Sequence, residues 1–232
     1  MTGQDLLAAR AVKKWNQKEA AGKLGVSQPY LSLLENGGRP VPAELAAKAV
    51  RVYGLSHALL PMRPAEKKAL FVAETLPALD LDLAALGYPG FSYLTTRRPK
   101  KNPAEVLFAA LGAKHLDSRV IEALPWIVWR FPELDWQWLT DAARLNDLQN
   151  RLGFVVNIAR RLAERGGERE KAALFAQQER ALEFSRLVSE DTLCHDLMTV
   201  AERRWLRKNR SPQARHWRLL TDLSPEHLDY AR

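Results

Sequence analysis

The sequence is poor in cysteine, because Cys194 is the only one among 232 residues. No disulfide can form within such a chain, which agrees with a reducing compartment. No run reaches the roughly 18 uninterrupted apolar residues that a membrane span needs. The first residues, Met1 to Asp5, also lack the basic-then-apolar layout of a secretion signal. We therefore expect a cytoplasmic protein that does not contact a membrane.

The sequence also lacks the motifs of common enzyme classes. It has no phosphate-cradling glycine loop and no serine in a nucleophile elbow. Cys194 and His195 are poorly arranged for zinc, because neighbouring helical residues point about 100° apart and no second cysteine exists. The acidic residues between Glu179 and Asp191 lie among arginines at helical spacing, which is typical of a solvated face. We expect no enzymatic activity, no metal and no cofactor.

What the sequence does have is positive charge. The net charge is +8, which favours a polyanionic partner, because lysine and arginine placed near phosphates release condensed counterions. Residues 1–60 carry eight basic and four acidic side chains. The basic excess nearly vanishes over 63–140 and returns more weakly after residue 141.

Helical periodicity runs through most of the chain. Apolar residues recur at steps of three and four, and proline and glycine mark the gaps. The pattern predicts helices near 4–13, 17–24, 28–35, 42–52, 64–76, 103–111, 118–130, 135–149, 150–165, 168–188, 191–208 and 212–220. Residues 87–102 resist this interpretation and indicate a short strand or an extended linker.

These elements predict an all-α protein in three parts. Residues 1–62 would form a five-helix N-terminal domain, 63–102 connecting helices and a linker, and 103–232 a larger helical bundle. The clearest apolar seam consists of Leu145, Leu148, Leu152, Val155, Ala159 and Leu162. We expect it to pack within the chain, against apolar residues such as Leu174, Leu182, Val188, Leu193, Leu197 and Val200. A coiled-coil dimer seam is the alternative.

The most informative stretch is residues 17–37. Ala21 is small enough for two helices to cross closely, and Gly25 can take the positive φ of a tight turn between them. Ser27 can cap the second helix, while Pro29 falls in its first turn, where a missing N–H does no harm. Four apolar side chains would close the core: Leu24, Val26, Leu31 and Leu34.

This stretch resembles the lambda-repressor-like, Xre-type helix-turn-helix family, and the likeness covers roughly the first 55 to 60 residues. The matching features are Gln17, Ala21, Gly25 to Ser27, Leu31, Leu34, Glu35 to Gly37, Leu45, Ala49 and Tyr53 to Leu55. The resemblance implies a structural ion pair between Arg10 and Glu35, and it implies DNA binding through the helix that follows the glycine turn.

The same resemblance assigns roles at the DNA. Base readout would come from Ser27, Gln28, Tyr30 and Ser32, and backbone contacts from Gln17, Lys18, Asn36 and Arg39. Gln28 is the best candidate for direct readout, because a carboxamide can form a bidentate pair with adenine. The reading helix carries no lysine or arginine, which departs from a purely electrostatic interface.

Two features of the C-terminal half are candidates for a partner surface. Trp126, Trp129, Trp136 and Trp138 crowd one segment, where core packing is the default and an interface the alternative. The stretch 202–218 is rich in arginine, including Arg203 and Arg207, with Trp205 and Trp217 interleaved. It is suited to RNA, to an acidic protein or simply to solvent.

These observations favour a sequence-specific repressor that binds a palindromic, double-stranded operator as a homodimer. By analogy with the family, its helical extension would neutralise a cognate toxin, as an antitoxin does. One alternative is a ligand-sensing regulator, which requires a concave apolar pocket with a few converging polar groups. Another is a protein–protein adaptor whose helix-turn-helix is vestigial.

Overall fold

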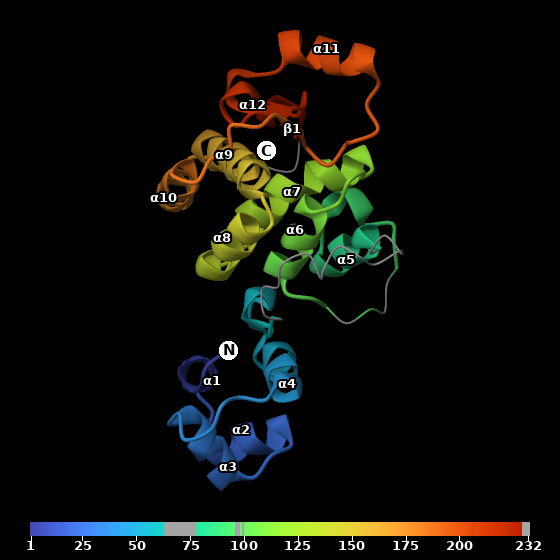
Figure 1. Cartoon of the computed structure of the whole chain (residues 1–232). Coiled ribbons are helices and arrows are strands. Elements are labelled where there is room, and N and C mark those ends of the chain that lie inside the picture. Colours follow the sequence, from blue (N-terminus) through green and yellow to red (C-terminus); the bar gives the residue numbers. More distant parts are fainter. Residues whose placement is uncertain (63–77, 96–97, 99, 229–232) are drawn as a thin grey trace. The chain divides into compact units, whose positions relative to one another are not determined.

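The computed structural model describes residues 1–62, 78–95, 98 and 100–228 (Figure 1). The chain divides into two compact units, residues 1–63 and 64–232. The predicted all-α class is confirmed, because the described residues contain one small sheet of two-residue strands beside many helices. No helix in this part of the chain has the length and apolar composition needed to cross a membrane.

The described residues of unit 1 form four α-helices and a 3₁₀ turn: α1 (Gly3–Val12), α2 (Gln17–Leu24), α3 (Gln28–Glu35), α4 (Ala43–Tyr53) and η1 (His57–Leu59). Local signals set where they begin. The side chains of Thr2 and Asn16 each accept a hydrogen bond from the backbone N–H three residues later. The side chains of Asp5 and Glu19 accept in return from the N–H of Thr2 and Asn16, which completes a capping box for α1 and for α2. The helix predicted over 64–76, in the connecting part, lies outside the described residues.

The core of unit 1 is built from small and medium apolar side chains: Leu6, Ala9, Ala20, Ala21, Leu24, Leu31, Leu34, Leu45, Ala49 and Tyr53. Short helices bury little area each, so they must approach closely. Gly3 shows how closely, because a Cβ atom at this position would lie 1.9 Å from the carbonyl oxygen of Leu34. Glycine therefore allows the first turn of α1 to pack against the end of α3.

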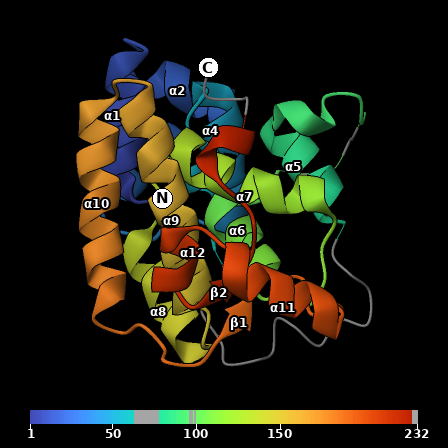
Figure 2. The same cartoon turned by 90° about the horizontal axis from the view of Figure 1, so that it is seen from above.

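Unit 2 contains α5 (Leu79–Leu86), η2 (Pro89–Phe91), α6 (Pro103–Leu111), α7 (Ser118–Arg130), α8 (Trp136–Leu145), α9 (Gln149–Arg165), α10 (Arg169–Glu183), β1 (Asp191–Thr192), α11 (Val200–Asn209), α12 (Pro212–His216), β2 (Leu219–Leu220) and η3 (Pro225–His227). Helix α9 is its centre, packed between α10 and α7 (Figure 2). Buried residues cover nearly every face of α9, as expected of a helix surrounded by others.

The apolar seam packs inside unit 2, as expected. Its members from Leu148 to Leu162 are buried, whereas Leu145 is half exposed, because the chain turns at Asp147 (φ 58°) between α8 and α9. The expected partners Leu182 and Leu193 are buried too. The expected partners Val188, Leu197 and Val200 are instead among the most exposed apolar side chains.

A short strand or an extended linker was predicted over 87–102. This prediction is wrong for residues 87–91, which form the end of α5 and the η2 turn. Gly87, at φ 93°, ends α5, and η2 then folds back onto unit 2. The cause is aromatic packing: the ring of Tyr88 contacts those of Phe91 and Trp126, with centroids 5.6 and 5.2 Å apart. Residues 79–91 thus pack within unit 2.

The helices predicted over 191–208 and 212–220 are too long. Residues 191–192 and 219–220 form β1 and β2, which pair in parallel with Asp191 opposite Leu219. The buried Arg151 of α9 holds β1, donating from Nε and Nη2 to the two carboxylate oxygens of Asp191 at 2.7 and 2.9 Å. Its Nη1 donates to the carbonyl oxygens of Leu111 and Ala113. The bidentate contact between Arg151 and Asp191 therefore stabilises residues 191–192 as a strand, although their sequence pattern is helical.

Candidate nucleic-acid interface

Helices α2 and α3 meet through the glycine turn that the sequence predicts. Gly25 is in the left-handed region (φ 68°, ψ 35°), and Ala21 is buried where the two helices cross. The carbonyl oxygen of Ala21 accepts from the N–H of Val26 at 3.0 Å. The Ser27 hydroxyl accepts from the N–H of Tyr30, so Ser27 caps the first turn of α3. This geometry presents the start of α3 at the surface.

A chain of polar side chains runs from the core of unit 1 to this surface. Glu35 is fully buried, and its carboxylate accepts from Arg10 Nε at 2.6 Å and from Arg10 Nη2 at 3.0 Å. Gln17 Nε2 also donates to Glu35, at 2.9 Å, and Gln17 Oε1 accepts from Gln28 Nε2 at 2.8 Å. The ion pair that the resemblance implies is therefore present, and hydrogen bonds connect it through Gln17 to Gln28.

This chain of contacts fixes the orientation of the Gln28 carboxamide. One N–H of Gln28 is engaged by Gln17, and the other N–H and the amide oxygen remain available. An adenine edge in the major groove requires one donor and one acceptor in this arrangement. The guanidinium of Arg10 also stays charged, because its hydrogen bonds to Glu35 raise its pKa above the ordinary value.

The other predicted readout residues are placed differently from one another. Ser27 and Gln28 are exposed at the start of α3, and Ser32 lies one turn further along, partly buried. Ser32 Oγ accepts from Asn36 Nδ2 at 3.4 Å. Tyr30 is half-buried and packs against the core, so only part of its ring faces solvent.

Sequence reasoning missed Leu33, which is 49% exposed on α3 despite its apolar character. An exposed leucine beside polar readers can contact a thymine methyl group. The exposure of Leu33 could have been predicted from the sequence. Leu31 and Leu34 are three residues apart and share the buried face of α3, so the helical period places Leu33 on the opposite face.

The predicted backbone-contacting residues surround this surface. Lys18, Asn36 and Arg39 are exposed, and Gln17 is partly buried because of its bonds to Glu35 and Gln28. Lys23 is also exposed and lies over the ring of Trp15, 4.7 Å from its centroid. Helix α3 carries no lysine or arginine, and the exposed cations Lys18, Lys23 and Arg39 lie on adjacent elements.

The comparisons with known proteins agree with this geometry. A family model described as helix-turn-helix matches residues 6–60. Residues 6–60 are a lambda-repressor-like, Xre-type helix-turn-helix domain. The match supports a DNA-binding transcriptional regulator.

One relative is a propionyl-CoA carboxylase regulator from Cereibacter sphaeroides, 29% identical over 135 residues. The alignment is longer than the helix-turn-helix domain and covers 53% of this chain and 29% of the relative. The chain thus matches less than a third of that protein's length. No solved structure matches the chain.

In unit 2, the tryptophans proposed as a partner surface have structural contacts. Trp126 is buried and contacts Phe131, so its assignment to a surface is wrong. The other three are half-buried. Trp129 Nε1 donates to Glu168 at 2.7 Å, and Trp136 Nε1 donates to the carbonyl oxygen of Pro132 at 2.9 Å. The ring of Trp138 packs edge-on to that of Phe108.

The arginines proposed for that surface are engaged as well. Arg203 donates to the carbonyl oxygen of Asp196 at 2.9 Å, and Arg207 donates to Glu190 at 2.8 Å. On the opposite face of α11, Trp205 is 57% exposed. It lies between Arg204 and Lys208, two exposed cations that form no ion pair within the described residues.

Cys194 and His195, the residues weighed for zinc, also have structural contacts. The thiol of Cys194 is buried and donates to the carbonyl oxygen of Ala110 at 3.2 Å. The ring of His195 lies against that of His115, with centroids 4.7 Å apart.

Proposed function

We propose that this protein is a sequence-specific transcriptional repressor that binds a palindromic operator as a homodimer and catalyses no reaction. The observation that carries the proposal is Gln28, which is exposed at the start of α3 and oriented by Gln17 and the buried Arg10–Glu35 pair. Ordering a readout side chain before binding reduces the entropy that recognition costs. The relative from Cereibacter sphaeroides is named as a regulator, which supports the same role.

In this proposal α3 enters the major groove with Gln28 on an adenine and Leu33 near a thymine methyl. Ser27, Tyr30 and Ser32 would complete the contact surface of the helix. Gln17, Lys18, Asn36 and Arg39 would contact phosphates and fix the position of α3 without reading sequence. Two subunits of a dimer would protect half-sites one helical turn apart, about 34–36 Å.

Footprinting on the promoter of the gene that encodes the chain tests the proposal. Gln28→Ala is expected to relax discrimination at one base pair in each half-site by about 1–3 kcal/mol, or about 5- to 150-fold. Lys18→Ala is the matched control: it should weaken binding to all sequences alike and reduce the salt dependence by about one phosphate contact. A Gln28→Ala protein with unchanged base preference would refute the readout assignment.

A second candidate function, the antitoxin, is favoured by the exposed face of α11. Trp205, flanked by the exposed cations Arg204 and Lys208, has the composition of a protein-binding hot spot with complementarity to an acidic partner. The test is co-purification of the chain with the product of the adjacent gene, using wild type and Trp205→Ala. Loss of the complex in Trp205→Ala supports the antitoxin. Absence of a complex with wild type rejects it.

The adaptor alternative makes the opposite prediction for DNA. It requires that no promoter fragment be protected at physiological salt, although the helix-turn-helix is folded. A footprint that Gln28→Ala alters would exclude it.

A further inference from the structure

Two histidines from distant parts of the sequence lie side by side in unit 2. A short antiparallel bridge pairs His115 with His195. The residues that follow them, Leu116 and Asp196, each donate an N–H across the bridge, at 2.9 and 2.8 Å, to the carbonyl oxygen before the partner histidine. Bonds between the flanking residues are the mark of a non-hydrogen-bonded pair, in which the side chains approach most closely. The two imidazoles therefore leave the same face of the bridge.

The two rings have the spacing of ligands that share one metal ion. Their centroids lie 4.7 Å apart, and the ring planes are inclined at 48° rather than stacked in parallel. A metal ion bonded at about 2.0–2.1 Å to one nitrogen of each ring would place the ring centres about 4.5–5.2 Å apart, for N–metal–N angles of about 90–110°. The observed spacing falls inside this range.

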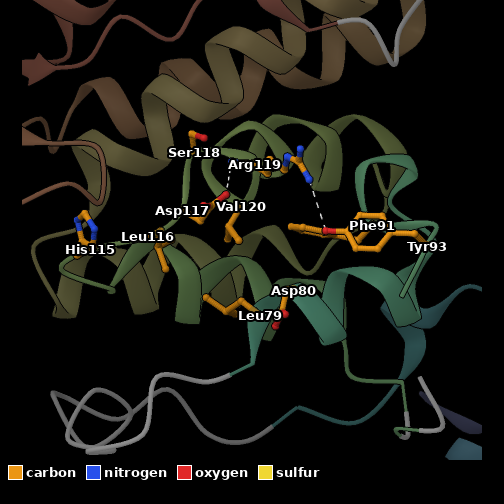
Figure 3. Close-up of a pocket in the computed structure, with 10 residues that line it drawn as sticks. All are labelled: Leu79, Asp80, Phe91, Tyr93, His115, Leu116, Asp117, Ser118, Arg119 and Val120. Carbon is orange, nitrogen blue, oxygen red and sulfur yellow. Dashed lines mark hydrogen bonds between the residues drawn. The ribbon is translucent and has the colours of Figure 1, made fainter. Parts of the chain in front are cut away.

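The ring nitrogens are also available to a ligand. Within the described residues, neither imidazole forms a hydrogen bond or an ion pair. His115 is exposed and His195 is half-buried. His115 also borders a cavity of about 560 Å³ (Figure 3), which gives an entry path and room for the water molecules of a coordination shell.

The carboxylates near the pair are engaged in other contacts. Asp117 and Asp196 are close to the histidines in sequence, and Glu202 interacts electrostatically with His195. The carboxylate of Asp117 caps α7, that of Asp196 accepts from a threonine hydroxyl, and that of Glu202 completes the capping box of α11. In the described part of the chain, no three side chains of histidine, cysteine, aspartate or glutamate are grouped to hold a metal ion. A metal ion at this bridge would thus have two protein ligands.

The neighbouring cations are directed elsewhere. Lys114 precedes His115, but alternate residues of an extended segment project to opposite faces, so its side chain leaves from the other face of the bridge. Arg203 donates to the carbonyl oxygen of Asp196. Figure 3 shows the guanidinium of Arg119 well apart from the ring of His115.

Imidazole nitrogen is a ligand for zinc, copper and nickel, whereas magnesium and calcium prefer oxygen. We propose that His115 and His195 together bind one divalent transition metal ion, such as Zn²⁺ or Cu²⁺, with water as the remaining ligands. The ion links the segment before α7 to the segment before α11, which are distant in sequence. It therefore stabilises the folded form of unit 2, in which the two rings are adjacent.

The first test is calorimetric titration of the full chain, without an affinity tag and without DNA. Because no operator is present, a failure here is distinct from a failure of the repressor proposal. Zn²⁺ should bind one ion per chain with a Kd of about 1–100 µM, which is weaker than a structural site with four protein ligands. Mg²⁺ at the same concentration should not bind, because it requires oxygen ligands.

Two substitutions assign the ligands. His115→Gln and His195→Gln should each weaken Zn²⁺ binding by at least about tenfold, because the second imidazole no longer binds intramolecularly. His227→Gln is the matched control, since His227 is an exposed histidine outside the pair, and its Zn²⁺ affinity should equal that of wild type. Circular dichroism verifies that the variants are folded.

Electron paramagnetic resonance of the wild-type chain loaded with Cu²⁺ does not depend on any variant. Hyperfine splitting from two imidazole nitrogens is expected, and splitting from one nitrogen would reveal a lone histidine and overturn the proposal. The proposal is also overturned if Zn²⁺ does not bind at millimolar concentration or if Mg²⁺ binds equally well. Wild-type Zn²⁺ affinity in either His115→Gln or His195→Gln would have the same consequence.

Discussion

The two units of this chain are held together by contacts of different sequence range. In unit 1 helices α1, α2 and α3 begin at caps that close over three residues, and the Arg10–Glu35 pair joins positions 25 apart. In unit 2 the contact between Arg151 and Asp191 spans 40 residues, and the bond from Cys194 to Ala110 spans 84. Contacts over short separations leave a pattern in the sequence, whereas contacts over long separations do not.

The two buried ion pairs also differ in which partner is shielded. In unit 1 the acid is buried, since the side chain of Glu35 is 0% exposed. In unit 2 the cation is buried, and the carboxylate of Asp191 is 37% exposed. Removing one partner strands a charge in the interior only when the buried member remains. The substitutions below test this difference, from the largest expected effect to the smallest.

Arg10→Met should destabilise unit 1 by about 3–5 kcal/mol, because it leaves the Glu35 carboxylate buried without its countercharge. Hydrogen exchange of the amides in α2 and α3 reports unit 1 by itself and is the appropriate measurement. Arg51→Met, at an exposed position of α4, is the control and should change stability by less than about 0.5 kcal/mol. Equal protection in the two variants would contradict a stabilising role for the pair.

Asp191→Asn should destabilise unit 2 by about 1–3 kcal/mol, because Arg151 stays buried while its bidentate acceptor is lost. Asp196, 3.7 Å from Arg151, limits the loss. The amides of α9 and α10 provide the readout, and Asp222→Asn, at an exposed site, is the control. If Arg151→Met costs more than Asp191→Asn, the stranded-charge argument fails for this unit.

Two glycine substitutions compare packing in the units. A Cβ at Gly153 would lie 2.3 Å from the buried ring of Trp217, so Gly153→Ala should destabilise unit 2 by about 1–3 kcal/mol. A Cβ at Gly22, within α2, would meet no described neighbour within 4 Å, so Gly22→Ala should stabilise unit 1 by about 0.5–1 kcal/mol. Denaturant unfolding gives both values. If both substitutions stabilise their units, helix propensity rather than packing dominates.

Cys194 should have the smallest effect on stability near neutral pH. Burial raises the pKa of its thiol from 9.0 to about 12. The folded-state pKa lies above the unfolded value, so this contribution is complete below about pH 9 and is lost as the pH rises toward 12. A thiol reagent such as DTNB should therefore label the folded chain very slowly at mildly alkaline pH and the denatured chain rapidly. Fast labelling of the native protein would disprove burial of the thiol.

The helices of unit 1 follow the sequence prediction closely, and their residues explain why. The turn and the helix start depend on residues within the segment itself, namely Gly25, Ser27 and Pro29. Helices α2 and α3 accordingly have the predicted bounds. The link from Glu35 through Gln17 to Gln28 was not predicted, although all three residues were singled out. The sequence shows where glutamines occur, but it does not show that the side chain of Gln28 donates to that of Gln17.

Prediction failed in unit 2 where residues distant in sequence compete with local preference. Helix α5 was missed because its apolar and acidic residues show no helical period. Periodicity wrongly predicts that a helix begins at residue 191, where the structure has β1. The hydrogen bonds from Arg151 to Asp191 fix this segment, and a contact between residues 40 apart leaves no periodic pattern in the sequence. Trp126 and Trp205 are equally aromatic, yet one is buried and the other exposed.

The sequence by itself determined the helical class, the glycine turn and the bounds of α2 and α3, because caps, turns and apolar period act within a few residues. The tertiary structure alone decided which cations are paired, how Gln28 is oriented and which ring lies against that of His195. Those features depend on the distance between side chains that the folded backbone brings together, and no local pattern specifies that distance.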